Sequence, residues 1–270
     1  MLKNRLIPNI ILNNGNIVQS VNFKHTNVIG NAVTAVDFFN SWAVDEIIIL
    51  DVSRDKNYRH TFHKIIRGLS KRCFIPLTVG GWIDSISEIQ KLLQLGADKI
   101  SINTIAVENP DFINEASRIF GSQCITTSID VKKNESDEYE VIIDRGRKHT
   151  GLDPIKWAKE AEERGTGEIF LTSIDRDGTK EGYDLNLVKS ISEEISIPVI
   201  AFGGVGQWEH FVDGIRNGRA DAVSAANIFH FSEHSTYNAK NFMRDAGLNV
   251  RIPQFFEIPT PRKPKYNEIF

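Results

Sequence analysis

The chain has 270 residues, 41% of them hydrophobic and 25% charged, with a formal net charge of −3. This composition is ordinary for a globular protein, and without a cluster of Lys and Arg it gives no sign of nucleic-acid binding. The two cysteines, Cys73 and Cys124, form no CxxC pair, which argues against a disulfide scaffold or zinc cluster and favours a reducing cytoplasm. No apolar run is long enough to span a bilayer, and the first residues show no cleavage pattern, so we expect neither a membrane segment nor a signal peptide.

Short apolar runs alternate with amphipathic segments along the chain. The runs are almost continuously hydrophobic, as in parallel strands that are buried on both faces: Leu6–Leu12, Glu46–Val52, Pro76–Val79, Lys99–Ile102, Ile125–Val131, Glu168–Ser173, Pro198–Phe202 and Ala222–Ala225. The segments between them repeat apolar residues with the helical period: Ala32–Ala43, Phe62–Cys73, Ile86–Leu95, Pro110–Phe120, Pro154–Arg164, Leu185–Glu194, Trp208–Asn217 and His234–Ala246. Alternating strands and helices predict either a closed (β/α)8 barrel or an open doubly wound sheet.

An internal repeat decides between these two folds. Residues 46–55 (EIIILDVSRD) align with residues 168–177 (EIFLTSIDRD), and two further blocks follow in the same order in both halves. Two similar halves of four strands each close naturally into a barrel, whereas an open sheet would give the halves unequal edges. We therefore predict an α/β fold, a (β/α)8 TIM barrel with a twofold internal repeat.

The last twenty residues differ from the rest of the chain. Residues 251–270 contain four prolines and mixed charge, which excludes a further helix of the barrel. We expect residues 1–250 to form a single barrel domain and residues 251–270 a Pro-rich tail, either docked or disordered.

Two Gly–Gly pairs are expected at the carboxyl ends of the barrel strands, where the active sites of such barrels lie. Gly80-Gly81 follows the third strand and Gly203-Gly204 follows the seventh, and the next strand in each half ends in small or polar residues. Glycine lets backbone N–H groups approach an anion closely. Two such half-sites on opposite sides of the mouth predict an elongated substrate with a phosphate at each end, although simple turns would also use glycine pairs.

Acidic side chains end several of the predicted strands. Asp51 ends the second strand, Asp130 ends the fifth, and Asp177 lies in the turn after the sixth. Asp177 precedes a glycine and suits either a substrate contact or a helix cap. Asp130 lies between its strand and a predicted loop, residues 131–140, with no helix start beside it. For Asp130 we therefore favour a role as general acid or base.

Charged residues also occur where the strands begin, at the opposite mouth of the barrel. They stand at or just before the first residue of the first, second, fourth and sixth strands: Arg5, Glu46, Lys99 and Glu168. Two cations and two anions at one level can form a ring of salt bridges. Such a ring either plugs the bottom of the barrel or gates it.

Several long segments resemble the cyclase subunit (HisF) of imidazole glycerol phosphate synthase. They keep the family's order and lie within a match that extends from about Leu2 to Arg251: FIPLTVGG, GADKISIN, NPDFINEASRIFGSQC, WAKEAEERGTGEIFLTSIDRDGTKEGYD, IPVIAFGGVG and ADAVSAANIFHF. The resemblance implies a cytoplasmic two-protein machine, in which a glutaminase (HisH) docks on the N-terminal face of the barrel and releases ammonia into its interior. At the far mouth, the cyclase would condense ammonia with a bis-phosphorylated aminoimidazole ribulotide.

The resemblance also assigns roles to individual residues. The family's ammonia gate corresponds to Arg5, Glu46, Lys99 and Glu168, and its general acid on the fifth strand corresponds to Asp130. The family's phosphate-binding positions correspond to Gly81, Asn103, Thr104, Asp177, Gly178, Gly203, Gly204 and Ala226. To the substrate-binding set we add three residues at strand ends, Asp51, Thr172 and Asn227.

The sequence departs from the family at the substrate end, while the four gate residues are unchanged. The family's second catalytic aspartate, at the end of the first strand, is Ile11, which cannot move a proton. A loop lysine near one phosphate is Gln19, so a charge-assisted contact is lost. A third glycine is Trp82, whose indole we expect to crowd the first half-site. Two serines of the second half-site are Phe202 and Asn227.

Two functions follow from these departures. The chain is either a cyclase of histidine synthesis with an altered mechanism or a paralogue that keeps the glutaminase partner and the ammonia conduit. HisF-like paralogues without the first-strand aspartate occur in surface-glycan pathways beside a further sugar amidotransferase, where they help to install an acetamidino group, and we favour this hypothesis. A metal-dependent barrel enzyme is a weaker alternative, because the histidines show no ligand spacing and His60 and His63 are expected on a solvated helix face. We predict no metal, no cofactor, and neither a nucleic-acid nor a membrane partner.

Overall fold

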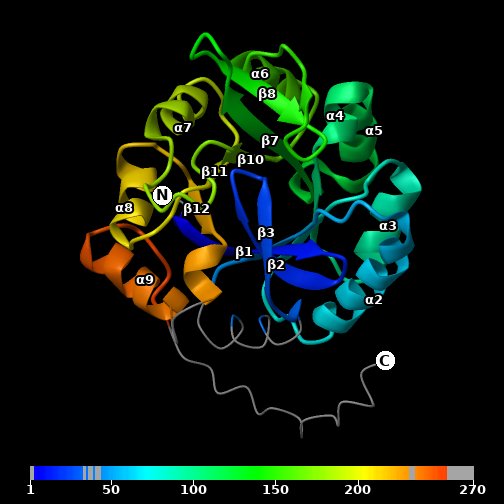
Figure 1. Cartoon of the computed structure of the whole chain (residues 1–270), viewed down its shortest axis with the longest axis horizontal. Coiled ribbons are helices and arrows are strands. Elements are labelled where there is room, and N and C mark those ends of the chain that lie inside the picture. Colours follow the sequence, from blue (N-terminus) through cyan, green and yellow to red (C-terminus); the bar gives the residue numbers. More distant parts are fainter. Residues whose placement is uncertain (1–2, 33–34, 36–38, 40–43, 231–234, 254–270) are drawn as a thin grey trace, which may run out of the picture.

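The barrel predicted from the sequence is present. The computed structural model describes residues 3–32, 35, 39, 44–230 and 235–253. Eight parallel strands follow one another around a closed barrel within this part of the chain, and the last pairs with the first (Figure 1). In barrel order they are β1 (Arg5–Asn13), β4 (Ile47–Asp51), β5 (Leu77–Gly80), β6 (Lys99–Ile102), β7 (Ile125–Lys133), β10 (Glu168–Ser173), β11 (Val199–Phe202) and β12 (Ala222–Ala225).

Helices pack around the outside of the strands in Figure 1. They are α2 (Arg59–Ser70), α3 (Ile86–Gln94), α4 (Thr104–Glu108), α5 (Asp111–Phe120), α6 (Pro154–Glu163), α7 (Leu185–Ser192), α8 (Glu209–Arg216) and α9 (Ser235–Asp245), with short 3-10 turns η1 (Lys56–Tyr58), η2 (Ser122–Cys124) and η3 (Asn227–His230). Helix α4 is not predicted by the sequence pattern. Most of the predicted helix Ala32–Ala43 and residues 254–270 of the tail lie outside the described residues. In the described ranges, no helix has both the length and the apolar character needed to cross a membrane.

Capping side chains set where several helices begin. Ser85 accepts a hydrogen bond from the backbone N–H of Glu88 at the start of α3, and Asp184 does the same for Leu187 in α7. At α6, Asp153 is the cap and Pro154 follows it at the first helical position, where no backbone donor is needed. These local signals explain why the sequence places these helix starts within about two residues.

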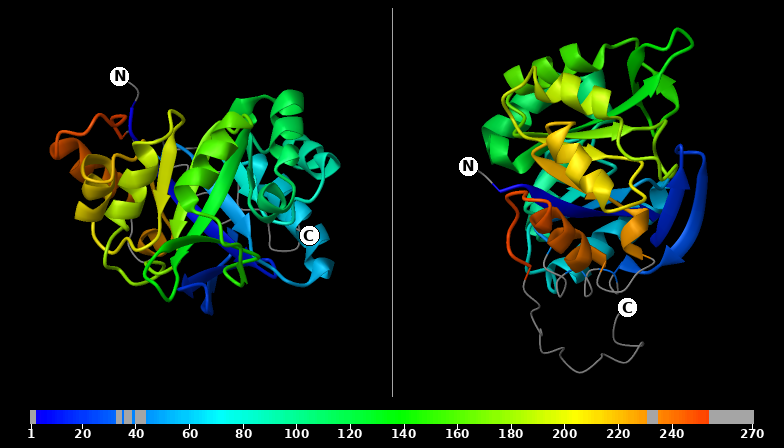
Figure 2. Two further views of the ribbon diagram at one scale, coloured as in Figure 1. Left: turned by 90° about the horizontal axis from the view of Figure 1, so that it is seen from above. Right: turned by 90° about the vertical axis from the view of Figure 1, so that its left-hand side faces the viewer.

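Two hairpins extend the barrel and continue the internal repeat. After β1 come β2 (Asn16–Val21) and β3 (His25–Gly30), and after β7 come β8 (Tyr139–Ile143) and β9 (Lys148–His149), all antiparallel to their neighbours. Both hairpins project at the end of the barrel opposite the N-terminus (Figure 2, right). The prediction of a loop over residues 131–140 is therefore wrong, because β7 runs on to Lys133 and pairs with β8. Asp130 consequently lies inside a strand and not at its end.

The buried side chains form an outer and an inner layer. The outer layer lies between strands and helices and includes Leu6, Ile10 and Leu12 from alternate positions of β1. The inner layer fills part of the lumen: Ile7, Ile11, Val18, Ile48, Phe170, Ile200, Phe202, Ala222 and Ala226. Since successive side chains of a strand point to opposite faces, Arg5 and Asn9 share the lumen-facing side of β1 with Ile7 and Ile11.

One predicted surface residue is buried. The prediction that His63 lies on a solvated helix face is wrong, because His63 is only 8% exposed and packs between α2 and α3. Its Nε2 atom lies 2.5 Å from Oε1 of Glu88, which also pairs with Arg59 at 2.9 Å. The apolar residues Phe62 and Ile66 of α2 are buried, and His63 is buried beside them on the same helix. His60 is exposed, as expected.

Candidate functional site

Four charged side chains meet in a ring at the end of the barrel where the strands begin. Nη1 of Arg5 lies 3.0 Å from Oε2 of Glu46 and 2.8 Å from Oε1 of Glu168. Nζ of Lys99 lies 3.1 Å from Oε2 of Glu46 and 2.8 Å from Oε2 of Glu168. Each cation therefore bridges both carboxylates. Thr78 adds a hydrogen bond to Oε1 of Glu46 at 2.5 Å, so the most deeply buried carboxylate of the ring has no unpaired oxygen.

Polar side chains continue from the ring into the lumen. Four of them are buried and hold polar side-chain atoms that find no hydrogen-bond partner in the described part of the chain: Asn9, Ser101, Thr126 and Ser224. Thr126 is the register partner of Glu168, and Ser224 is that of Ile7, so both face the lumen. Buried polar atoms are normally satisfied, and unpaired ones are suited to bind water or another small hydrogen-bonding molecule. The part of the lumen next to the ring therefore offers polar contacts.

Asp130 faces the lumen nearer its other end. It is paired in register with Thr172, and its Oδ2 accepts a hydrogen bond of 3.1 Å from the side-chain amide of Asn103. Burial raises the pKa of Asp130 to about 7, although hydrogen bonds from Thr172, Asn103 and Ser128 act in the opposite direction. Near neutral pH, this carboxyl group populates both its protonated and its ionised form. It is therefore suited to give and take protons.

The position facing Asp130 across the lumen is apolar. Strands β1 and β7 are four places apart in the eight-strand order, so they lie on opposite sides of the barrel. Ile11 of β1 is 7% exposed and belongs to the inner apolar layer with Phe170 and Phe202, whose rings are 5.2 Å apart. Strand β1 contains no acidic residue. Asp130 therefore has no acidic partner on the opposite strand.

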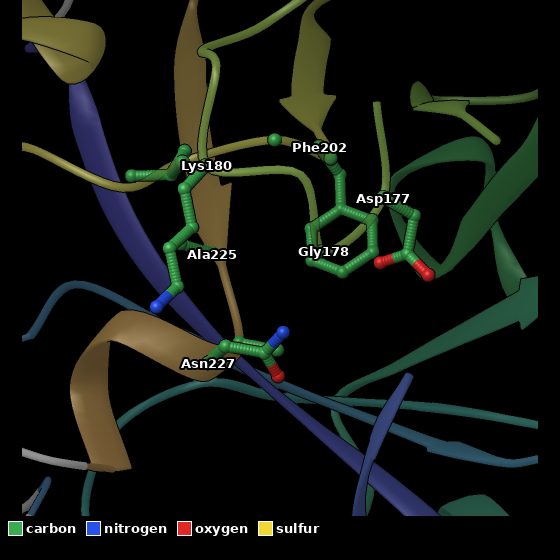
Figure 3. A pocket seen from close by; sticks show the side chains of 10 residues that line it. Asp177, Gly178, Lys180, Phe202, Ala225 and Asn227 are labelled. Carbon is green, nitrogen blue, oxygen red and sulfur yellow. The ribbon is translucent and has the colours of Figure 1, made fainter. Parts of the chain in front are cut away.

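The second half-site is a small recess between the ends of β11 and β12 and the turn after β10 (Figure 3). It is lined by Asp177, Gly178, Lys180, Phe202, Gly203, Gly204, Val205, Ala225, Ala226 and Asn227. Gly203 and Gly204 have φ values of 102° and 98°, in the region that favours glycine. A Cβ atom at Gly204 would lie 2.2 Å from the carbonyl oxygen of Gly182, and one at Gly203 would lie 2.8 Å from that of Ser173. The recess therefore depends on glycine at both positions.

A lysine that the sequence analysis missed enters this recess. The side chain of Lys180 extends toward Asn227, whose Oδ1 is buried and has no hydrogen-bond partner among the described residues (Figure 3). Lys180 follows Gly178 by two residues, so its place in the same turn is the signal that could have identified it. A lysine beside glycine backbone is a common arrangement for binding phosphate as a point charge.

Asp177 is turned away from solvent and toward the β2–β3 hairpin. It is 4% exposed, and its Oδ2 accepts hydrogen bonds from Oγ of Ser20 at 2.5 Å and from the backbone N–H of Phe23 at 3.3 Å. Burial raises its pKa. Asp177 and Gly178 thus anchor the hairpin over the mouth, and a Cβ atom at Gly178 would lie 2.5 Å from the carbonyl oxygen of Ser20.

At the first half-site, the polar side chains form hydrogen bonds with other residues of the protein. The Asp51 carboxylate accepts hydrogen bonds from Ser53, through its backbone N–H at 2.9 Å and its hydroxyl, and from Nε1 of Trp82 at 3.1 Å. Burial raises the pKa of Asp51. Gly81 has a φ of 106°, and a Cβ atom there would lie 2.4 Å from the carbonyl oxygen of Asp51. The indole of Trp82 therefore holds Asp51 in addition to occupying space beside Gly81.

The two remaining predicted residues of this half-site are also engaged. The amide of Asn103 donates to the carbonyl oxygen of Ser128 at 3.1 Å as well as to Asp130. The hydroxyl of Thr104 accepts a hydrogen bond of 3.2 Å from the backbone N–H of Asp144, in the turn between β8 and β9. The second hairpin is thus tied to the first half-site, as the first hairpin is tied to Asp177. Among the described residues, no three His, Cys, Asp or Glu side chains gather as they would around a metal ion.

Comparison with known proteins agrees with this arrangement. The family described as histidine biosynthesis protein matches residues 5–235. A protein of Vibrio vulnificus (strain YJ016), named provisionally as imidazole glycerol phosphate synthase subunit hisF2, is 47% identical over 252 residues, which cover 93% of this chain and 92% of that protein. The chain is a HisF-like member of the histidine biosynthesis family.

The structure locates the residues at which we expect this HisF-like chain to depart from the family pattern. Ile11 and Phe202 both belong to the apolar inner layer, and Phe202 also lines the second half-site. Gln19 is half-buried on β2, next to the Ser20 that binds Asp177. Trp82 holds Asp51 at the first half-site. Asn227, the fifth departure, lines the second half-site. All five therefore lie in the lumen or around the mouth, whereas the ring at the other end is complete.

Proposed function

We propose that the protein is a HisF-type synthase subunit that receives ammonia from a partner glutaminase and uses it at the opposite end of its barrel. The glutaminase, HisH-like, would dock on the N-terminal face in the cytoplasm. One observation carries this proposal. A closed ring of charges, Arg5, Glu46, Lys99 and Glu168, lies at one end of the barrel interior, and a buried acid of near-neutral pKa, Asp130, faces the same interior nearer the other end.

The ring would act as the gate of the conduit. Because each cation bridges both carboxylates, a molecule can enter along the axis only when one member of the ring moves aside. The ring is partly exposed at the end face, with 23% of the Arg5 side chain accessible, so a docked partner could displace it. Ammonia is small and forms hydrogen bonds, which suits it to the unpaired polar atoms of Asn9, Ser101 and Ser224 beyond the ring.

The opposite mouth would bind a phosphorylated small-molecule substrate. Backbone N–H groups around Gly178, Gly203 and Gly204, together with Lys180, would hold a phosphate at the second half-site. Asn103, Thr172 and Asp51 line the strand ends between the two half-sites. Asp130 would transfer protons at the carbon that accepts nitrogen.

A second candidate concerns the acceptor itself. The absence of an acid on β1 and the presence of Trp82 at the first half-site favour an acceptor other than the bis-phosphorylated imidazole precursor. Closing an imidazole ring requires protons both to arrive and to leave, and Ile11 cannot take part. In this case the subunit would deliver ammonia, beside a further sugar amidotransferase, for an acetamidino group on a surface-glycan sugar.

A coupled assay tests the proposal. The protein, its glutaminase and glutamine are supplied either with the imidazole precursor or with an acetamido sugar nucleotide plus the sugar amidotransferase. We expect turnover of the imidazole precursor to be about 10²- to 10⁴-fold below that of a cyclase with both acids. Turnover at the full rate would contradict the glycan candidate and support the histidine pathway.

The same assay contains the test of the gate. Lys99→Ala leaves Glu46 and Glu168 bridged by Arg5 alone, so we expect the ratio of aminated product to glutamate to fall while glutamine is still hydrolysed. Lys148→Ala is the matched control, because Lys148 is exposed and pairs with Glu108 on the surface. An unchanged ratio for Lys99→Ala would remove the gate from the proposal.

A further inference from the structure

Two guanidinium groups stand beside the first half-site, and the proposed function uses neither of them. Arg145 lies in the turn between β8 and β9, and its Cζ atom lies 5.1 Å from the centroid of the Trp82 ring. Arg54 directly follows Ser53, which holds Asp51. Burial lowers the pKa of Arg145, the negative charges of Asp144 and Asp51 act in the opposite direction, and the positive charges of Arg147 and Arg54 lower it further. The two guanidinium groups are thus close enough to repel each other.

The neighbouring arginines form close ion pairs with carboxylates. Arg147 makes a two-pronged contact with Asp144, with both distances 2.7 Å. Arg176, which occupies the place of Arg54 in the second half of the repeat, pairs with Glu181 at 3.0 Å. In the described part of the chain, neither Arg54 nor Arg145 forms an ion pair with a carboxylate. Arg145 is half-buried and Arg54 is exposed, and the partial burial of the Arg145 cation costs free energy that an anionic ligand would offset.

Backbone conformation shows that Arg145 and Trp82 are held in place against local preference. Trp82 has a φ of 61° and Arg145 a φ of 58°, and both lie in the left-handed region that side-chain-bearing residues rarely adopt. Such conformations cluster at functional sites, where the surrounding contacts over-determine them. Here the contacts are the hydrogen bond from Trp82 to Asp51 and the one from Asp144 to Thr104, which fixes the turn that carries Arg145.

We propose that Arg54 and Arg145, with Trp82 as the platform under Arg145, form a binding site for a phosphoryl group of the substrate. The two arginines would bind the phosphoryl group in place of the backbone at Gly81. Asn103 and Thr104 already form hydrogen bonds within the protein, and Trp82 occupies the space beside Gly81. Two guanidinium forks present paired N–H donors to the oxygens of one phosphoryl group, and their double charge matches a phosphate dianion better than a carboxylate. The inference rests on the proposed function only in assuming that the substrate is phosphorylated.

The consequence for substrate choice is geometric. The phosphoryl group would sit on side chains that come from the β4–α2 loop and the β8–β9 turn, and not on the backbone after β5. The substrate would therefore differ in reach from a compound that fits two glycine half-sites. This difference separates the chain from a cyclase without any change at Asp130.

Side-chain NMR of the full-length protein tests the site without any turnover. We expect inorganic phosphate to shift the Nε–H signals of Arg54 and Arg145, with little effect on Arg147. Acetate at the same ionic strength should give smaller shifts. The double variant Arg54→Gln/Arg145→Gln should lose phosphate binding at this site, and Arg145→Lys, which keeps the charge but loses the fork, should weaken it about tenfold. Unshifted Arg54 and Arg145 signals would overturn the proposal, and equal shifts with acetate would overturn the phosphoryl assignment.

Arg219→Gln is the matched control. Arg219 also has a φ of 58°, is exposed and pairs with Glu193 far from the mouth, so its loss should leave phosphate binding unchanged. Thermal unfolding shows whether the double variant is folded, and Arg145→Lys remains informative if it is not. Because the glutaminase coupling assay reports on Lys99 and not on the arginines, failure of the conduit and failure of the phosphoryl site give different results.

Discussion

The barrel is built from two similar halves that place different residues at equivalent positions of the mouth. Each half begins with a strand followed by a hairpin, β1 with β2–β3 and β7 with β8–β9. The first half has Ile11 where the second has Asp130. It has Asp55, an exposed cap of a 3-10 turn, where the second has the buried Asp177.

The two halves contribute different functional groups to the mouth. The second half supplies the buried acid and the open glycine recess with Lys180. The first half supplies an apolar lumen residue, Ile11, and Trp82, whose ring is contacted by Arg145 of the second half. The ring at the far end draws on both halves, because Glu168 comes from the second and the other three members come from the first. Under the proposed function, proton transfer would lie in the second half, and both halves would contribute to substrate recognition.

The largest effect is expected where the halves differ most, at Asp130. Asp130→Asn keeps the shape and the neighbour Asn103 but cannot transfer a proton, so turnover of the aminated acceptor should fall by about 10²- to 10⁴-fold. The converse variant, Ile11→Asp, should not raise turnover, and it should destabilise the fold because it buries a carboxylate among Phe170 and Phe202. Steady-state rates with ammonium salts as the nitrogen source measure both. A gain of activity in Ile11→Asp would contradict the assignment of proton transfer to the second half alone.

Asp130→Asn also tests the protonation state through stability. The folded pKa of about 7 lies above the ordinary value of 3.8, so the folded protein binds the extra proton more tightly than the unfolded chain. The free energy of unfolding of the wild type should therefore fall as pH rises from about 4 to about 7. Relative to Asp130→Asn, this loss should be on the order of 4 kcal/mol at alkaline pH, at 1.36 kcal/mol per pKa unit. Chemical denaturation at several pH values measures it, and parallel profiles would show that Asp130 has an ordinary pKa.

The sequence alone predicted the barrel more fully than the mouth. The strands are continuous apolar runs, and the repeat fixes their number, so β6, β10 and β12 were predicted with their observed bounds. The residues of the ring follow from their places at strand starts. The hairpins were missed, although Asn14-Gly15 between two apolar runs is a hairpin signal. The contact of Arg145 with Trp82 joins two distant loops, and no local pattern encodes it.

A smaller effect is expected at the glycines that build the second half-site. Gly204→Ala would place a Cβ atom 2.2 Å from the carbonyl oxygen of Gly182, whose own N–H donates to the carbonyl of Gly204 at 2.7 Å. The turn must shift, so we expect phosphate affinity to fall by about tenfold or more and stability by about 1–3 kcal/mol. Isothermal titration with inorganic phosphate and thermal unfolding measure the two effects. The control is Gly68→Ala in α2, where an added Cβ atom meets nothing within 4 Å and the helix should gain slightly.

The smallest effect is expected at Lys180, the cation of the second half-site. Lys180→Ala removes one point charge and leaves the glycine backbone intact, so KM for the phosphorylated substrate should rise up to about tenfold with little change in kcat. The difference from the wild type should shrink as salt rises from 0.05 to about 0.5 M, because mobile ions screen a charge at the protein surface. Lys156→Ala is the control, since Lys156 is exposed in the first turn of α6, away from the recess. If Lys180→Ala lowered kcat as strongly as Asp130→Asn, the lysine would act on the reacting atoms, and the second half would hold two catalytic groups where the comparison assigns it one.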